Sequence, residues 1–215
     1  IDRAAKLAGK AVIDVGCGNR KMPGALGIDV VRIPGVDLLG DLERGLPLAT
    51  GSVDELHAYH LLEHVGDFSA SMTEIWRVLR DGGRAHIKAP HAASTYTTWK
   101  DPTHRRGLSI ATFAYFDDTY FDGAVFKYYS PARFRIEKAR LCFTANGPPV
   151  DMPAPPSGRM LPPVEPHAIT VARRVANPMV HALANRSRGW QYACERFWGP
   201  IAGIEEVHVV LRAIK

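Results

Sequence analysis

The sequence has few of the features that mark specialised protein classes. It contains only three cysteines, Cys17, Cys142 and Cys194, which lie far apart and form no C-x-x-C pair. A disulfide framework and a thiolate zinc site are therefore not predicted, and this cysteine usage favours a reducing compartment. No apolar run approaches the roughly 20 residues that span a bilayer, and no signal-peptide pattern opens the chain. We therefore expect a cytoplasmic protein without a membrane segment.

Concentrated charge of one sign is also lacking. The chain has 27 Lys and Arg against 22 Asp and Glu, which gives a net charge of +5. The nearest approaches to a basic cluster are the arginine pairs at 105–106 and 173–174. Neither pair forms the long run that is typical of a nucleic-acid-binding tail. Nucleic acid is therefore not indicated as a partner.

Apolar segments are present in an order that indicates an α/β protein. With 215 residues, 46% of them hydrophobic, the chain is predicted to form a single domain over 1–215. A helix is predicted from Asp67, which caps it, because Phe68, Met72 and Ile75 recur at helical spacing. The first two strand connections are too short for helices, so loops or single turns are expected there. Strands are predicted at 11–15, 25–29, 36–40, 53–59 and 84–89.

The C-terminal third contains two further strands and an insertion. Segments 135–143 and 205–213 alternate like half-exposed strands, so they are expected to pair as the last two strands. The insertion at 146–203 begins with a proline-rich loop, continues as a helix from about 166 to 185, and includes a short helix at 190–198. Upstream, Ser109 is predicted to cap one short helix, and Ser130-Pro131 to begin another. We expect the insertion to form a cap on the substrate side.

A glycine turn follows the first strand. Gly16 and Gly18 would let a ligand approach the backbone at the carboxyl end of a parallel sheet. A dinucleotide-binding fingerprint would need a third glycine where Lys21 stands. Only about seven residues separate the turn from the next strand, so no helix N-terminus is available for a phosphate. A phosphorylated ligand is therefore poorly accommodated.

A nucleoside that carries an ammonium group and a carboxylate, but no phosphate, fits the acidic residues at the strand ends. Asp14 is placed to hold the amino group through water or a backbone relay, and Asp29 to accept both ribose hydroxyls. Asp41 is placed to accept from the adenine amino group, with Leu42 against the ring. S-adenosylmethionine carries these groups in this order. The alternative is that Asp29 and Asp41 are simply solvated strand ends.

Five motifs carry a family resemblance. DVGCG, GID, GDLE, YHLLEHV and RVLRDGGRAHIKAP follow one another within residues 10–118. In this order the chain resembles class I S-adenosylmethionine-dependent methyltransferases, in a subgroup with short first crossovers and a D-P-T-H loop. The resemblance implies a Rossmann-like, mostly parallel seven-stranded sheet, ordered 3-2-1-4-5-7-6 with strand 7 antiparallel. It also implies S-adenosylmethionine as cofactor, S-adenosylhomocysteine as product, and residues near the sulfonium after the fourth strand. The cofactor-binding residues expected are Asp14, Gly16, Cys17, Gly18, Asp29, Val30, Asp41, Leu42, His60 and Leu61.

The loop after the fifth strand carries the candidate catalytic residues His91, Asp101 and His104. Methyl transfer is an in-line displacement, so the acceptor must be oriented and a hydroxyl acceptor must lose its proton to a base. Either Asp101 and His104 form a base pair, or His91 acts alone. Alternatively, Asp101 caps the turn that Pro102 rigidifies and His104 anchors the loop. A divalent cation bound by the three residues is a further alternative.

No metal site is predicted from the neighbouring histidines. His60 and His64 are one helical turn apart, which is a spacing that can bind metal, but Glu63 is expected on a different face. His64 is therefore expected to be structural or to border the substrate pocket. The residues expected on the substrate side are His64, Tyr96, Trp99 and Arg105.

Together these patterns predict an enzyme that methylates an oxygen or nitrogen of a small molecule, such as a natural-product intermediate or a sugar. An RNA or protein methyltransferase of the same fold is one alternative. A regulatory protein that binds S-adenosylmethionine without catalysis is another. Whether the protein forms a homodimer is left open.

Overall fold

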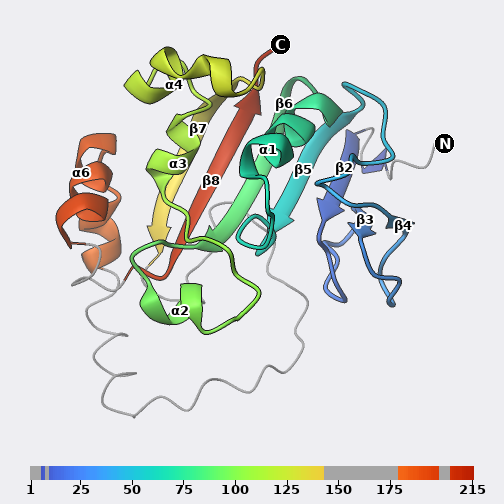
Figure 1. The fold of residues 1–215 in the computed structure, drawn as a ribbon, viewed down its shortest axis with the longest axis horizontal. Helices are drawn as coiled ribbons and strands as arrows, with labels where there is room; N and C mark the ends of the chain where they lie inside the picture. The colour runs from blue at the N-terminus through green and yellow to red at the C-terminus, as the bar shows by residue number, and fades with distance from the viewer. Residues whose placement is uncertain (1–5, 8–9, 143–178, 199–203) are drawn as a thin grey trace.

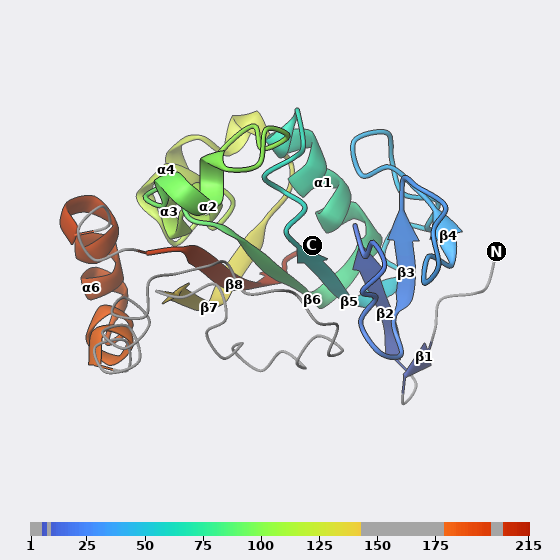
Figure 2. The same ribbon diagram turned by 90° about the horizontal axis from the view of Figure 1, so that it is seen from below.

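The computed structural model describes residues 6–7, 10–142, 179–198 and 204–215, which form a sheet with helices packed mainly on one side (Figures 1 and 2). The strands are β1 (Lys6–Leu7), β2 (Lys10–Val15), β3 (Leu26–Asp29), β4 (Leu38–Leu39), β5 (Val53–Tyr59), β6 (Leu79–Pro90), β7 (Phe134–Cys142) and β8 (Glu206–Ala213). The helices are α1 (Phe68–Val78), α2 (Thr95–Trp99), α3 (Ile110–Ala114), α4 (Phe121–Val125), the 3₁₀ helix η1 (Lys127–Tyr129), α6 (Arg188–Ala193) and the π-helical turn η2 (Cys194–Trp198).

The strand order confirms the predicted topology. The sheet runs β4-β3-β2-β5-β6-β8-β7, and the short β1 pairs with β2 outside this order. Strands β2 to β6 are mutually parallel where they pair, whereas β8 is antiparallel to both β6 and β7. Counting from β2, this is the order 3-2-1-4-5-7-6 of a Rossmann-like sheet with its seventh strand antiparallel.

Helix α1 forms where its apolar spacing and its cap predicted it. The Asp67 carboxylate accepts a hydrogen bond from the Ala70 amide at 2.8 Å, which satisfies one of the free donors of the first turn. Met72, Ile75 and Val78 are fully buried against the sheet. Each such side chain contributes roughly 1.5 to 3 kcal/mol through burial. The helix therefore fixes the loop that precedes it, between β5 and α1.

The two short crossovers are loops, as expected. Segments 16–25 and 30–37, which the structure describes in full, contain turns and no helix. Met22 and Ala25 in the first loop pack against Val12 and Tyr59 in a small apolar cluster apart from the main core. Helices α1 to α4 all lie on the other side of the sheet (Figure 2). The loop after β2 thus covers part of the sheet face that a helix would cover in a doubly wound fold.

The C-terminal prediction is confirmed for the strands but wrong at Ser130. Strands β7 and β8 pair antiparallel, and Ser109 caps α3 with a capping box to Thr112. Ser130-Pro131 does not begin a helix: Ser130 is extended, and its carbonyl accepts from the Arg133 guanidinium at 2.6 Å. That contact holds the segment as a loop that leads directly into β7.

Of the insertion predicted at 146–203, residues 146–178 and 199–203 lie outside the described residues. Within the described part, 179–184 is helical, and α6 with η2 matches the short helix predicted near 190–198. In the described ranges, no helix has the length and apolar character needed to cross a membrane.

Candidate functional site

The predicted cofactor residues gather at one edge of the sheet. Because β2, β3, β4 and β5 are parallel, their carboxyl ends meet at the same edge, where open α/β sheets bind ligands (Figure 1). The glycine turn follows β2, Asp29 ends β3, Asp41 follows β4 and His60 follows β5.

The glycine turn requires both of its glycines for different reasons. Gly16 and Gly18 have φ angles of +71° and +51°, in the left-handed region that favours glycine. A Cβ atom on Gly16 would lie 2.8 Å from Leu61 Cδ1, so the loop after β5 rests directly on this turn. A Cβ atom on Gly18 would meet nothing within 4 Å. The turn is therefore packed against Leu61 at Gly16, whereas the space beside Gly18 is open.

The Asp29 carboxylate connects the end of β3 to this turn. Its Oδ2 accepts from the Gly18 amide at 2.9 Å, and its Oδ1 accepts from the Val31 amide at 3.2 Å. Each carboxylate oxygen has two lone pairs, so the half-buried group retains capacity for two further donors. Val30, next in the chain, is 63% exposed beside it. The carboxylate is thus held in place while remaining able to bind a pair of hydroxyls.

Asp14 and Cys17 support the turn from within. Asp14 is 4% exposed, and its Oδ2 accepts from the Met22 amide at 2.8 Å. Burial raises the pKa of Asp14 to about 6, although the Met22 hydrogen bond opposes the rise. Burial likewise raises the pKa of the Cys17 thiol to about 11. The Asp14 carboxylate is therefore used inside the protein, where it holds the backbone at Met22.

The residues after β4 divide between surface and core. The Asp41 Oδ1 accepts from the Glu43 amide at 2.9 Å, and the carboxylate is partly exposed. Leu42 is buried in the main core. Glu43 Oε1 accepts from the amides of Gly66 and Asp67 at 2.9 and 3.0 Å, which ties this loop to the start of α1.

His60 has a strained backbone and two carboxylate partners. It is the one non-glycine residue with a positive φ, +52°, among those the structure describes. Its Nδ1 lies 3.3 Å from Glu63 Oε1, and its Nε2 lies 3.3 Å from Glu206 Oε1. Burial opposes protonation, but the nearby carboxylates of Glu206 and Glu63 outweigh it and raise the pKa of His60 to about 9. His60 is therefore an imidazolium at neutral pH.

His104 is oriented by a backbone carbonyl. Its Nδ1 donates to the Thr98 carbonyl at 2.7 Å, and its Nε2 faces Asp101 Oδ2 at 3.8 Å. Asp101 also accepts from the amide and hydroxyl of Thr103 at 2.9 and 2.7 Å, so it caps the turn. The aspartate thus faces the free nitrogen of His104, whereas the carbonyl of Thr98 holds the other nitrogen.

His91 lies in a different environment. It is 2% exposed, and its Nδ1 accepts from the Ala93 amide at 3.0 Å. Its Nε2 therefore carries the hydrogen and donates to Glu195 Oε1 at 3.0 Å. Glu195 also accepts from the Ile110 amide at 2.7 Å. Both nitrogens of His91 are engaged in joining the loop after β6 to α3 and η2, and neither has a free lone pair.

The residues predicted on the substrate side are placed as follows. Trp99 is 59% exposed at the end of α2. Arg105 is exposed, and its amide donates to the Glu63 carbonyl at 2.8 Å. The His64 ring lies edge-on to that of His104, with centroids 4.7 Å apart. Tyr96 is on α2, but its side chain lies outside the described part of the structure.

Glu63 is the functional candidate that sequence reasoning did not select. The sequence places Glu63 on a different face from His64 only if a helix already runs through residues 60–64. The structure instead has a turn, in which the His64 amide donates to the Leu61 carbonyl, and α1 begins only at Phe68. One ligand atom from each of Glu63, His64 and His104 lies within 4.8 Å of the others. A carboxylate within the apolar segment LLEHV was the available signal.

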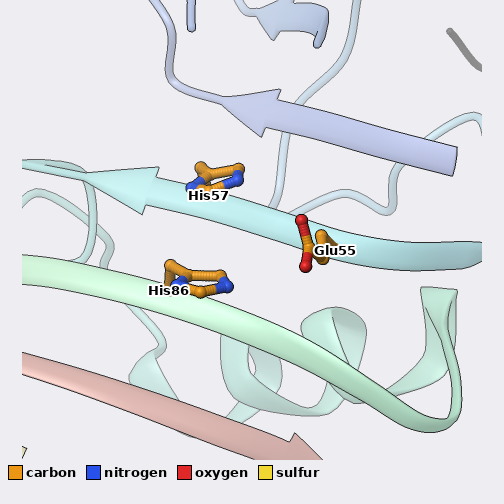
Figure 3. Close-up of side chains that lie close together, drawn as sticks. All are labelled: Glu55, His57 and His86. Atoms are coloured by element: carbon orange, nitrogen blue, oxygen red, sulfur yellow. The ribbon is translucent and has the colours of Figure 1, made fainter. Parts of the chain in front are cut away.

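A second polar cluster lies on the face of the sheet opposite α1. Glu55 and His57 are two apart on β5 and project to the same face, and His86 is the direct neighbour of His57 on β6 (Figure 3). The imidazole rings stack with centroids 4.7 Å apart. Burial lowers the pKa of His57 to about 3 and also lowers the pKa of His86. Both are therefore neutral near pH 7.

Known proteins match part of this sequence, and a solved structure resembles most of this chain in fold. Residues 30–87 match the family described as "Methyltransferase domain". A "probable S-adenosylmethionine-dependent methyltransferase" of Mycolicibacterium smegmatis is 29% identical over 132 residues, covering 50% of each chain. The "ubiquinone biosynthesis O-methyltransferase" of Chromobacterium violaceum is 29% identical over 105 residues, covering 39% of this chain and 45% of that protein. The chain thus spans about half the length of the curated relatives it matches.

The structural likeness extends further along the chain. A SAM-dependent methyltransferase from Archaeoglobus fulgidus superposes with a TM-score of 0.52, covering 94% of this chain and 85% of that one. The two share 14% sequence identity, so this likeness concerns the fold. The family match includes the loops after β4 and β5, and therefore Asp41 and the segment from His60 to His64.

Proposed function

We propose that this protein is a methyltransferase that uses S-adenosylmethionine and transfers its methyl group to an oxygen or nitrogen of a small molecule. The observation that carries the proposal is the Asp29 carboxylate held by the Gly18 amide at 2.9 Å, beside a turn that is open above Gly18. The match of residues 30–87 to a methyltransferase domain supports the same assignment. The D-P-T-H subgroup stays a prediction.

The charge at this edge favours the proposed cofactor over a phosphorylated one. No helix begins in segment 16–25, which the structure describes throughout, so no helix N-terminus faces the turn. Asp14 and Asp29 add acidic groups that repel a pyrophosphate and attract a sulfonium or an ammonium group. We assign Asp29 to the ribose hydroxyls, Asp41 to the adenine amino group, and Gly16–Gly18 to the amino-acid tail. When bound, S-adenosylmethionine supplies an electrophilic methyl group.

The transfer requires an acceptor that is oriented and, for a hydroxyl, deprotonated. The acceptor's lone pair forms the bond to the methyl carbon while the carbon–sulfur bond breaks and its electrons remain on sulfur. The products are the methylated acceptor, S-adenosylhomocysteine and a proton. His104 is the better base candidate. Its Nδ1 donates to the Thr98 carbonyl, which leaves Nε2 to accept a proton, whereas both nitrogens of His91 are engaged in hydrogen bonds. Asp101, 3.8 Å from that Nε2, would stabilise the imidazolium.

Several features support a small acceptor. Charge is dispersed, with a net value of only +5 over 215 residues. Exposed Trp99 and Arg105 follow β6 in the same segment as His104, and we assign this aromatic surface and this cation to the acceptor side of the site. The similarity to a ubiquinone biosynthesis O-methyltransferase favours an oxygen acceptor. The cysteine usage favours action in the cytoplasm.

The test is a metabolite screen with a methyl-labelled donor and mass-spectrometric detection. A labelled small molecule that forms only with the active protein would support the proposal. Label that appears instead in RNA or protein, with affinity that falls steeply with salt, would replace it with a macromolecular acceptor. Binding of S-adenosylmethionine without any methylated product would favour a regulatory role.

A further inference from the structure

We propose that Glu63, His64 and His104 bind a divalent transition-metal cation on the acceptor side of the site. The role given to this cation in catalysis rests on the proposed function, whereas its binding can be measured independently. The three residues come from two loops, the turn after β5 and the D-P-T-H loop after β6. One ligand atom from each lies within 4.8 Å of the other two.

The first observation is the state of the Glu63 carboxylate. Its side chain is 0% exposed, and neither oxygen has a hydrogen-bond partner among the described residues. Two imidazole nitrogens approach its Oε1, namely His60 Nδ1 at 3.3 Å and His104 Nε2 at 4.0 Å. A buried carboxylate without a donor is costly unless a positive charge compensates it. The His60 ring offsets part of this charge at 3.3 Å, but it makes no hydrogen bond to either oxygen, so the lone pairs of the carboxylate stay unused. These lone pairs are available to a cation in the space that Glu63 shares with His64 and His104.

The second observation is that the hydrogen bonds of both histidines leave one nitrogen free for a metal. The Thr103 hydroxyl donates its single hydrogen to Asp101 Oδ1 at 2.7 Å, so it accepts from His64 Nδ1 at 3.0 Å. His104 Nδ1 donates to the Thr98 carbonyl at 2.7 Å. In the neutral form of each ring, the free lone pair therefore lies on Nε2. This is the arrangement in which metal-binding histidines are usually held, with the second nitrogen donating to an oxygen.

The ligand set indicates the class of cation. Two imidazole nitrogens and one carboxylate oxygen suit Zn²⁺, Mn²⁺, Fe²⁺ or Co²⁺ better than Mg²⁺ or Ca²⁺, which favour all-oxygen sites. Three protein ligands leave coordination positions open, as catalytic metal sites do. His60 competes for Glu63, but its Nε2 also faces Glu206 at 3.3 Å, so it retains a carboxylate partner when the cation binds.

The position of the cluster suggests its use. Leu61, two residues before Glu63, rests on Gly16 of the cofactor turn, so the cluster lies beside the proposed donor site. A cation there would coordinate the acceptor oxygen and lower the pKa of its hydroxyl, so that the proton leaves without direct action of His104. A cation that keeps at least two positions open beyond the three protein ligands would prefer an acceptor with two adjacent oxygen atoms, such as a vicinal diol or a catechol.

The cluster of Glu55, His57 and His86 offers an internal control (Figure 3). There, no described oxygen accepts from either nitrogen of His86, and Glu55 is paired with Lys10 at 3.7 Å. His57 Nδ1 is hydrogen-bonded to the Tyr59 hydroxyl at 2.8 Å, so only one histidine of this cluster is held by a second partner. Both histidines of the first cluster are so held, and we therefore expect the second cluster to bind the same cations more weakly.

The test is a titration of chelator-treated protein with Co²⁺, followed by visible absorption, and with Zn²⁺, followed by calorimetry. We expect one strong site, a loss of at least tenfold in affinity in Glu63→Gln, and wild-type affinity in His86→Gln. Thr103→Val, which retains every ligand but removes the partner of His64, should weaken binding by about tenfold. Circular dichroism and thermal unfolding check that each variant is folded.

Two results would overturn the inference: no strong site in the wild-type protein, or a site that is lost in His86→Gln and retained in Glu63→Gln. Glu63 would then be assigned as the counter-ion of His60. Calorimetry with S-adenosylmethionine is run on the same samples. Cation binding without cofactor binding would contradict the proposed function and leave the cation site standing.

Discussion

The carboxylate of Asp29, the last residue of β3, accepts a hydrogen bond from the Gly18 amide in the turn after β2, at 2.9 Å. One side chain thus sets the distance between two loops of the proposed cofactor site. Because the same carboxylate can accept from a ligand, its loss would affect both the shape of the site and its affinity.

Replacing Asp29 by Ala should weaken S-adenosylmethionine binding about tenfold in calorimetry, because a lost pair of ribose hydrogen bonds costs roughly 1 to 3 kcal/mol. Asp118→Ala, which removes an exposed carboxylate paired with Arg135, is the matched control and should bind normally. Unchanged affinity in Asp29→Ala would contradict the ribose assignment.

Replacing His104 by Ala should lower turnover by at least tenfold while changing S-adenosylmethionine affinity little, because the ring faces Glu63 and Asp101 and not the glycine turn. Steady-state kinetics with the acceptor from the metabolite screen, beside calorimetry with the donor, separates the two effects. Wild-type turnover in this variant would remove His104 from the reaction under either role considered for it.

Replacing His91 by Ala should act mainly on stability. The change leaves the Ala93 amide and the Glu195 carboxylate without their His91 partner. We therefore expect the free energy of unfolding to fall by about 1 to 3 kcal/mol. Urea denaturation measures this effect, with exposed Arg44→Ala as the control. A stable variant with abolished turnover would instead restore His91 as a catalytic candidate.

The pH dependence of stability should show the contribution of Asp14. Burial raises its pKa from 3.8 to about 6, so between these values the folded protein binds more protons than the unfolded chain. The contribution of Asp14 to stability should therefore fall as the pH rises from about 4 to 6, by about 1.4 kcal/mol per pH unit and about 3 kcal/mol in all. Carboxylates with a lowered pKa, such as Glu206, contribute with the opposite sign, so the effect is measured as the difference in unfolding free energy between the wild type and Asp14→Asn at several pH values. Parallel profiles for the two proteins would contradict it.

Much of the fold could be predicted because its signals are local. Strand β5 begins and ends at the predicted residues 53 and 59, and Asp67 caps α1 as expected, since periodicity and capping depend only on neighbouring residues. The helix start predicted at Ser130-Pro131 was wrong because the Arg133 side chain bonds the Ser130 carbonyl and stabilises an extended backbone there, against the local preference.

The chemistry of the site was harder to predict than its location. The strand ends that carry Asp29 and His60 follow from topology, which the motifs indicated. Glu63 lies near His104 for two reasons: residues 62–64 form a turn and not a helix, and the loop after β6 returns to this turn. The pairing of His57 with His86 depends on strand register, which no local pattern specifies.

Cys142 and Glu206 are direct partners in the register of β7 and β8, so the intervening chain leaves and rejoins the sheet at a single point. That point lies at the carboxyl end of β7, and Glu206 reaches from it to His60. The described end of this excursion packs back onto the protein, since Gln191 donates to the Ala139 carbonyl of β7 and Glu195 accepts from His91 in the loop after β6. A change of length or sequence there would leave the strand order intact and would be felt first by the loop that carries His91 and His104.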